Sequence, residues 1–250
     1  MTFCLGIRLK TGLIGLSDTR ITSGNETTRA KKVFTLNRKK HSLFIMTSGL
    51  RSIRDKAITY FNEVLEEQDQ YFNKLYKGVN AFAEQVRRVN QEDSKSLVDS
   101  GLNFNLHAIV GGQLEDDERH KLFMLYPQGN WIEIGQATPY IIIGNTGFGR
   151  PILDRSVRYE SDIKYSLKSA FLSFDATRIS SNDVDYPIDI ILYLHNSYNI
   201  IEHRFEYNDL EKISDLWRKK IEKGLNELPD DWMNHIFAKL NHKNLDEIAL

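Results

Sequence analysis

Cysteine, proline and long apolar runs are all scarce in this sequence of 250 residues. The single cysteine, Cys4, excludes an intrachain disulfide and a disulfide-stapled secreted domain, and it fits a reducing compartment. Only 5 prolines and 15 glycines are present, which excludes collagen-like and low-complexity chains. No run approaches the roughly 18 apolar residues of a membrane helix, and the first residues lack the basic start of a signal peptide. We therefore expect a cytoplasmic protein with no membrane partner.

An excess of charge of one sign is also missing. The chain has 33 Lys and Arg against 34 Asp and Glu, so it lacks the basic surface that nucleic acid requires, and no such partner is expected. Its 7 histidines show no metal-ligand spacing, and the phosphate-binding loop with its Lys-Ser/Thr pair is absent. We predict no metal and no cofactor. We interpret the glycine-rich residues 144–149 as a strand-to-helix turn rather than as a nucleotide site.

Hydrophobic residues make up 41% of the chain, which is enough for a sizeable core. Alternating and short apolar runs predict strands at residues 2–10, 13–17, 32–36, 41–47, 103–110, 122–126, 131–134, 140–143, 188–194 and 200–207. Apolar residues three to four apart predict helices around residues 53–65, 75–89, 163–174 and 209–224, with another that begins near Pro151. Residues 22–29 are polar and are predicted to form a loop, and Gly111-Gly112 is predicted to end a strand.

Strands that come in runs, with pairs of helices between them, favour antiparallel sheets with helices packed outside rather than alternating βαβ units. No internal repeat and no low-complexity linker divides the chain. We therefore predict an α+β fold in a single domain over residues 1–250, in which residues 226–250 form a peripheral helix or tail.

Thr2, at the start of the first predicted strand, suggests a specific chemistry. Removal of Met1 would leave Thr2 with a free α-amino group beside its hydroxyl. A threonine hydroxyl is a poor nucleophile without a base, and this amine is a base within the same residue. The ordinary pKa of an α-amino group is about 7.7–8.0, which suits general base catalysis near neutral pH.

Further motifs follow Thr2 in a defined order. Ser17-Asp18-Thr19-Arg20 ends the second predicted strand, Lys31-Lys32-Val33 opens the third, and Met46-Thr47-Ser48-Gly49 ends the fourth. This order resembles the proteasome β-type subunits and their bacterial relatives among the N-terminal nucleophile hydrolases. Residues 144–155 (GNTGFGRPILDR) and 173–177 (SFDAT) look like the bacterial Anbu group, whose members also start with Met-Thr and have no propeptide. The resemblance covers about residues 2–210.

The resemblance implies a four-layer αββα sandwich of two stacked antiparallel sheets flanked by helices. It also implies roles for individual residues. Thr2 matches the nucleophile, Lys32 matches a lysine whose ammonium lies near the threonine amine and hydroxyl, and Asp18 matches the carboxylate that holds this lysine. The backbone N–H of Ser48 or Gly49 would donate to the oxyanion of the tetrahedral intermediate.

The later part of the chain matches less well. Asp175 matches an aspartate that hydrogen-bonds around the terminal threonine. Asn145 and Thr146 stand where the family has a serine after glycine, and Arg178 stands where it has a serine three residues after the aspartate. Supporting roles are expected for five residues: Arg20, Asn145, Thr146, Ser180 and Ser181.

The resemblance implies a threonine-type endopeptidase that cleaves peptides or unfolded proteins inside a homo-oligomer. Two alternatives remain open: a non-peptide amidase on the same fold, because fold does not fix substrate, and a non-hydrolysing scaffold like the proteasome α-type subunits. The scaffold is disfavoured because α-type subunits carry a helix before their first strand. Structural interpretations also exist for these residues. Asp18 and Arg20 could be a strand-end turn and a surface charge, and Lys31 and Lys32 could be solvated lysines on an edge strand.

Overall fold

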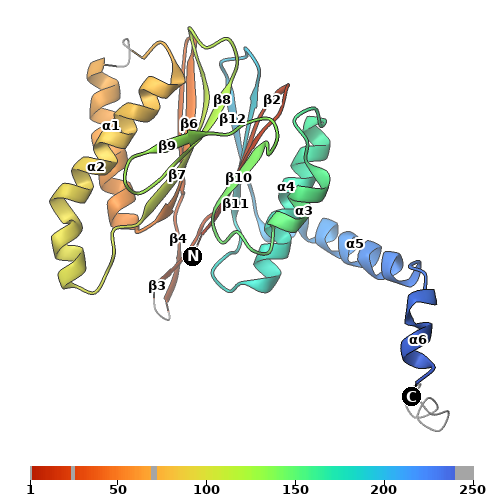
Figure 1. The fold of residues 1–250 in the computed structure, drawn as a ribbon. Coiled ribbons are helices and arrows are strands. Elements are labelled where there is room, and N and C mark those ends of the chain that lie inside the picture. The colour runs from red at the N-terminus through yellow and green to blue at the C-terminus, as the bar shows by residue number, and fades with distance from the viewer. Residues whose placement is uncertain (1, 24–25, 69–71, 240–250) are drawn as a thin grey trace. The chain divides into compact units, whose positions relative to one another are not determined.

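The computed structural model describes residues 2–23, 26–68 and 72–239, and the chain divides into two compact units, residues 1–207 and 208–250. The first unit is a mixed α+β fold built on two five-stranded antiparallel sheets and a separate strand pair (Figure 1). The antiparallel sheets that the sequence predicts are therefore confirmed. The assignment of residues 1–250 to one domain stays a prediction.

The first sheet has the strand order β10-β1-β2-β11-β12. Its strands are β1 (Phe3–Arg8), β2 (Gly12–Asp18), β10 (Tyr140–Gly144), β11 (Ile188–Leu194) and β12 (Ile200–Phe205). The central strands β1 and β2 form a hairpin in which Cys4 pairs with Ser17 and Gly6 with Gly15. This register places the start of β1 beside the end of β2, where the sequence has Asp18.

The second sheet has the order β5-β6-β7-β8-β9. Its strands are β5 (Val33–Arg38), β6 (His41–Gly49), β7 (Leu106–Leu114), β8 (Lys121–Leu125) and β9 (Trp131–Glu133). The polar segment 22–29, predicted as a loop, instead contributes to a strand pair, β3 (Arg20–Ser23) and β4 (Glu26–Arg29). That prediction was wrong because strand pairing depends on backbone N–H and C=O groups, which polar residues supply equally well.

Helices cover the outer faces of the two sheets (Figure 1). The helices α1 (Arg51–Gln68) and α2 (Leu75–Asp99) contact β6, β7 and β8. On the other sheet, α4 (Ile163–Ser180) contacts β1 and β2 and pairs with the short α3 (Arg150–Ser156). Among the described residues, no helix is long and apolar enough to cross a membrane.

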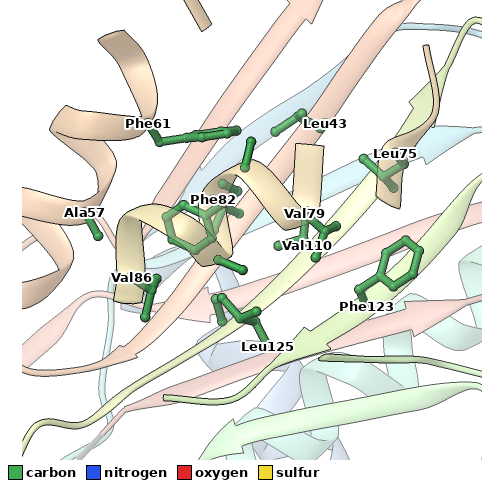
Figure 2. Packing of buried hydrophobic residues seen from close by; sticks show 14 of the residues in the cluster. Leu43, Ala57, Phe61, Leu75, Val79, Phe82, Val86, Val110, Phe123 and Leu125 are labelled. Atoms are coloured by element: carbon green, nitrogen blue, oxygen red, sulfur yellow. The ribbon is translucent and has the colours of Figure 1, made fainter. Parts of the chain in front are cut away.

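One hydrophobic core lies between the helix pair α1/α2 and the second sheet. Phe61 of α1 and Phe82 of α2 meet edge to face with ring centroids 5.4 Å apart. Val79 and Val86, one turn to either side of Phe82, belong to the same buried cluster as Val110 of β7, and Val79 lies beside Val110 (Figure 2). The apolar spacing of three to four residues that predicts these helices therefore marks the faces that the sheet covers.

A second core fills the space between the two sheets. It joins Cys4 of β1 and Ile191 of β11 to Phe44 of β6 and Ile109 of β7. The β7 strand runs on through Gly111-Gly112, which the sequence predicts as its end. A Cβ on Gly111 would lie 2.4 Å from a ring carbon of Phe44, its pairing partner on β6, so this glycine makes room for that ring within the sheet and does not mark a turn.

The second unit contains most of α5 (Tyr207–Asn226), the 3₁₀-helix η2 (Asp231–Met233) and α6 (Asn234–Phe237). The helix predicted around residues 209–224 lies within α5. The peripheral helix or tail predicted at 226–250 consists, up to residue 239, of two short helical turns. Its remaining residues, 240–250, lie outside the described part of the chain.

The Gly111→Ala variant tests the close packing of the Phe44 ring against β7. We expect the added methyl group to lower the free energy of unfolding by about 1–3 kcal/mol, because the Phe44 ring and the two strands have little room to shift. Gly135→Ala is the matched control, since nothing lies within 4 Å of a Cβ at that position. Urea denaturation of both variants measures the effect. Equal stability of Gly111→Ala and Gly135→Ala would contradict the close packing.

Candidate active site

Thr2 lies at the start of β1, on the side of that strand that faces the second sheet. Side chains alternate along a strand, so Thr2, Cys4 and Gly6 share one face. A Cβ on Gly6 would contact Ile109 of β7, which identifies this face as the inner one. The odd-numbered face packs on α4, where Phe3 meets Phe174 with ring centroids 6.1 Å apart. Thr2 is therefore directed toward the gap between the sheets and is 7% exposed.

Backbone contacts from the end of β10 hold Thr2 in place. The carbonyl oxygen of Thr2 accepts a hydrogen bond of 2.7 Å from the backbone N–H of Asn145. Gly144 has a φ of +90°, and a Cβ there would lie 1.9 Å from the same carbonyl oxygen. Only glycine therefore fits at this position. The Ser48 hydroxyl lies 3.2 Å from that same Cβ position, so the ends of β1, β6 and β10 meet at Thr2.

The buried carboxylate of Asp18 connects three neighbouring segments. Its Oδ1 accepts hydrogen bonds from the backbone N–H of Phe3 (2.8 Å) and from Nζ of Lys32 (2.7 Å). Its Oδ2 accepts from the backbone N–H of Arg20 at 3.2 Å. Because Phe3 directly follows Thr2, one carboxylate fixes both the start of β1 and the Lys32 ammonium.

Burial and charge act in opposite directions on Asp18. Its side chain is fully buried, and burial raises the pKa of the carboxyl. The Lys32 charge and the backbone N–H groups of Phe3 and Arg20 oppose this rise. Burial also raises the pKa of the Cys4 thiol to about 12, although the Lys32 charge lowers it. Cys4 therefore stays protonated at neutral pH.

Two adjacent lysines have separate surroundings. Lys31 is half-exposed and its Nζ lies 2.5 Å from a carboxylate oxygen of Glu202. Lys32 is 4% exposed, and its carbonyl oxygen accepts the backbone N–H of Thr47 at 3.1 Å. The interpretation of Lys32 as a solvated edge lysine is thus wrong, because the side chain is buried in an ion pair with Asp18.

Thr2 opens onto a cavity of about 690 Å³. Of the residues predicted for the site, the cavity lining includes Thr2, Arg20, Lys32, Ser48, Gly49 and Thr146. Asp18 lies behind Lys32, and Asn145 contributes its backbone N–H as described above. The structure therefore brings eight of the predicted residues into one neighbourhood.

Three predicted residues on or near α4 do not line this cavity in the described structure: Asp175, Ser180 and Ser181. Asp175 is buried and forms an ion pair with Arg178, whose Nη2 lies 2.9 Å from Oδ1. The arginine that replaces the family's serine therefore reaches back along α4 to this aspartate. Ser180 is the last residue of α4 and Ser181 its C-cap.

The cavity also contains residues that the sequence analysis missed, among them Arg51, Arg54 and His107. Arg51 and Arg54 lie in the first turn of α1, which has no acidic residue. Acidic side chains are normally favoured in the first turn of a helix, because they face the positive end of its dipole. Two arginines in this turn are therefore unusual, and they could have marked the site in the sequence. His107 has no such signal, because it enters through the pairing of β7 with Ser48 of β6. Among the described residues, no group of three or more His, Cys, Asp or Glu could hold a metal ion.

The Lys32→Met variant tests the buried ion pair. Near pH 7 we expect it to lower the free energy of unfolding by about 3 kcal/mol, since it leaves the Asp18 charge buried and unpaired. Loss of Lys32 raises the folded-state pKa of Asp18 further above its unfolded value. The resulting penalty is therefore absent below the unfolded pKa of about 4 and grows as the pH rises.

Urea denaturation of Lys32→Met and the parent at pH 4 and pH 7 measures this dependence. The matched control is Lys31→Met, which removes a half-exposed partner of Glu202 and should cost less than about 1 kcal/mol. A stability difference between Lys32→Met and the parent that is the same at both pH values would contradict the assignment.

Comparison with known proteins finds similarity to solved structures only. No family model and no curated protein matches the sequence. Among solved structures, an Anbu (Gly-1) mutant from Hyphomicrobium sp. strain MC1 is similar with a TM-score of 0.85 and 25% identity, over 92% of this chain and 99% of that one.

Two further solved structures agree with this likeness. Anbu from Yersinia bercovieri, described as an ancestral beta-subunit, matches with a TM-score of 0.84 and 25% identity over 91% of this chain and 98% of that one. The helical assembly of the Anbu complex from Pseudomonas aeruginosa matches with a TM-score of 0.86 and 25% identity, over 91% and 97%. The resemblance seen in the sequence is therefore confirmed, and the chain is a structural relative of the Anbu proteasome-like proteins.

Proposed function

We propose that this protein is an N-terminal threonine hydrolase that cleaves peptide bonds, with Thr2 as nucleophile after removal of Met1. The observation that carries the proposal is the position of the Asp18 carboxylate. Its Oδ1 accepts both the N–H of Phe3, next to Thr2, and the Nζ of Lys32. A buried cation is thereby held at the edge of the cavity onto which Thr2 opens.

In the proposed reaction the Thr2 Oγ attacks the carbonyl carbon of the scissile peptide bond, and its proton passes to the α-amino group of Thr2. The Lys32 ammonium favours this step because a nearby positive charge keeps the amine neutral and makes the hydroxyl more acidic. The tetrahedral intermediate then collapses. The C–N bond breaks and the leaving amine takes the proton from the α-ammonium group.

The product of this first half is an ester between Thr2 and the acyl part of the substrate. Water, deprotonated by the same α-amino group, attacks the ester carbon. The bond between this carbon and Thr2 Oγ then breaks, Oγ takes the proton from the α-ammonium group, and the acid is released. The proposed oxyanion donor is the backbone N–H of Ser48 or Gly49, at the end of β6, where both residues line the cavity. We propose a positioning role for Asp175, because the neighbouring Phe174 of α4 packs on Phe3, the residue after Thr2.

The proposal includes the αββα arrangement. We take the first unit as a four-layer sandwich, because α1 and α2 contact one sheet, α4 contacts the other, and residues of both sheets share a core (Figure 1). It also includes self-assembly. The relative from Pseudomonas aeruginosa is described as a helical assembly, and apolar residues recur along α5 at Ile213, Trp217 and Ile221 with the spacing of a packing face. The single cysteine supports the cytoplasm as location.

Substitution of Thr2 tests the mechanism. We expect Thr2→Ala to abolish hydrolysis and to change the free energy of unfolding by no more than about 1–2 kcal/mol, because only the hydroxyl and the methyl group of the side chain are lost. Thr2→Ser keeps both hydroxyl and amine and should retain activity. The measurement is mass spectrometry after reaction with a peptide epoxyketone, whose ketone carbon reacts with the hydroxyl and whose epoxide carbon reacts with the amine. The expected product is an adduct at Thr2.

Intact mass of the purified protein provides the control, because the mechanism requires a species that lacks Met1. A chain that keeps Met1, forms no adduct and cleaves no peptide would overturn the proposal and favour a non-hydrolysing scaffold. Adduct formation at Thr2 with hydrolysis of small amides but of no peptide would favour a non-peptide amidase.

Light scattering tests self-assembly. At micromolar concentration we expect the molar mass of an oligomer, which exceeds the 29.0 kDa of one chain by a whole-number factor. Trp217→Asp should reduce that mass if α5 takes part in the assembly. A parent protein that remains at 29.0 kDa over the whole concentration range would contradict self-assembly.

A further inference from the structure

The charged side chains in the described lining of the cavity beside Thr2 are all positive. Arg20, Lys32, Arg51 and Arg54 line it, and its described lining contains no Asp or Glu. This is unusual for a chain with as many acidic as basic residues. Two carboxylates that are not part of this lining pair with these cations. Asp18 forms an ion pair with Lys32, and Asp185 forms one with Arg20 at 3.1 Å.

The remaining two cations share a single carboxylate. Asp55 accepts Nε and Nη2 of Arg54 at 2.8 and 2.6 Å through one oxygen, and Nε of Arg51 at 3.2 Å through the other. Two positive charges against one negative charge leave a surplus at the start of α1. Arg54 is the more enclosed of the two, with a side chain 12% exposed against 58% for Arg51.

Polar groups without partners lie in the same lining. Within the described part of the chain, Nε of Arg20, Oγ1 of Thr22 and Oγ1 of Thr47 are buried and have no hydrogen-bond partner. Thr47 is 3% exposed and immediately precedes Ser48. A buried polar group without a partner is costly, and such groups gather where a ligand supplies the missing hydrogen bonds.

The helix geometry adds to this charge. α1 begins at Arg51, so the positive end of its dipole lies at the cavity. Its first turn carries Arg51 and Arg54 and no acidic residue, which is the arrangement least favourable for the isolated helix. An anion bound in the cavity would offset both the dipole and the arginine charges.

We propose, on the basis of the function proposed above, that this cavity selects substrates with a carboxylate close to the scissile bond and that Arg54 is the main specificity-determining residue. The carboxylate has two possible sources: an Asp or Glu side chain on the acyl side of the bond, or the free C-terminus of a short peptide. The guanidinium group suits either, since its planar N–H groups match the two oxygens of a carboxylate.

Four peptide epoxyketones that end in Glu, Gln, Leu or Lys test the side-chain source. The rate of adduct formation at Thr2 should be at least tenfold higher for Glu than for Gln, its uncharged isostere. Raising the ionic strength should reduce this ratio, because salt screens exposed charges. Equal rates for Glu and Gln, with no preference for a free C-terminus in the binding assay below, would overturn the inference while leaving the proposed function intact.

A binding assay separates the inference from catalysis. The Thr2→Ala protein should bind a fluorescent peptide with Glu at least tenfold more tightly than its Gln counterpart, as measured by fluorescence anisotropy. Peptides with a free C-terminus and with a C-terminal amide, otherwise identical, test the second source. If no epoxyketone forms an adduct, the function proposed above fails, whereas a preference for the carboxylate in this assay would still support the cavity's selectivity.

Charge substitutions locate the selectivity. Arg54→Gln should reduce the Glu-to-Gln ratio about tenfold, and Arg54→Lys, which keeps the charge but loses the planar group, should retain part of it. Arg51→Gln provides a second variant with a more exposed side chain, so a smaller loss is expected. The matched control is Arg88→Gln, since Arg88 pairs with Glu92 on α2 and does not line the cavity. A ratio that Arg54→Gln leaves unchanged in a folded protein would exclude Arg54 as the selective residue.

Discussion

The position of Thr2 depends on a single buried carboxylate. Asp18 brings together the start of β1, the end of β2 and the beginning of β5, because it accepts the N–H groups of Phe3 and Arg20 and the ammonium of Lys32. A carboxylate without exposure to solvent is unfavourable unless it is paired and hydrogen-bonded. The three donors meet this need, and in doing so they fix the relative position of a strand end and a cation. Stability and the proposed catalysis thus rest on the same group.

The two sheets contribute different residues around this carboxylate. The first sheet supplies Thr2 and Asp18 from the β1/β2 hairpin, and the second supplies Lys32, Ser48 and Gly49 from the ends of β5 and β6. The cavity therefore forms where the ends of strands from both sheets meet, and close packing between the sheets sets its width. Gly6 of β1, where a Cβ would lie 2.9 Å from Ile109 of β7, is one of the positions that permit this packing. The first turn of α1 adds its two arginines to the lining of the cavity.

Much of this architecture could be predicted from the sequence, because the residues concerned carry local signals. The alternation along β1 and the helical spacing of Phe82 and Val86 reflect burial on one face, which any sequence pattern records. The strand pair β3/β4 could not be predicted in this way, since its side chains are polar and only backbone groups pair. Arg54 was missed because its role depends on where α1 begins relative to Thr2. The partner of Asp175 was missed because Arg178 lies where the family has a serine.

The contacts that hold Thr2 from the β10 side are made almost entirely by the main chain. The N–H of Asn145 would donate to the Thr2 carbonyl from any residue except proline, and Gly144 is required only for its lack of a Cβ. Such contacts place few demands on side-chain identity, so many substitutions around them would leave Thr2 in the same place. The overall fold is compatible with wide sequence change too, since three solved structures overlay on the chain with TM-scores of 0.84–0.86 at 25% identity, while no family model matches its sequence.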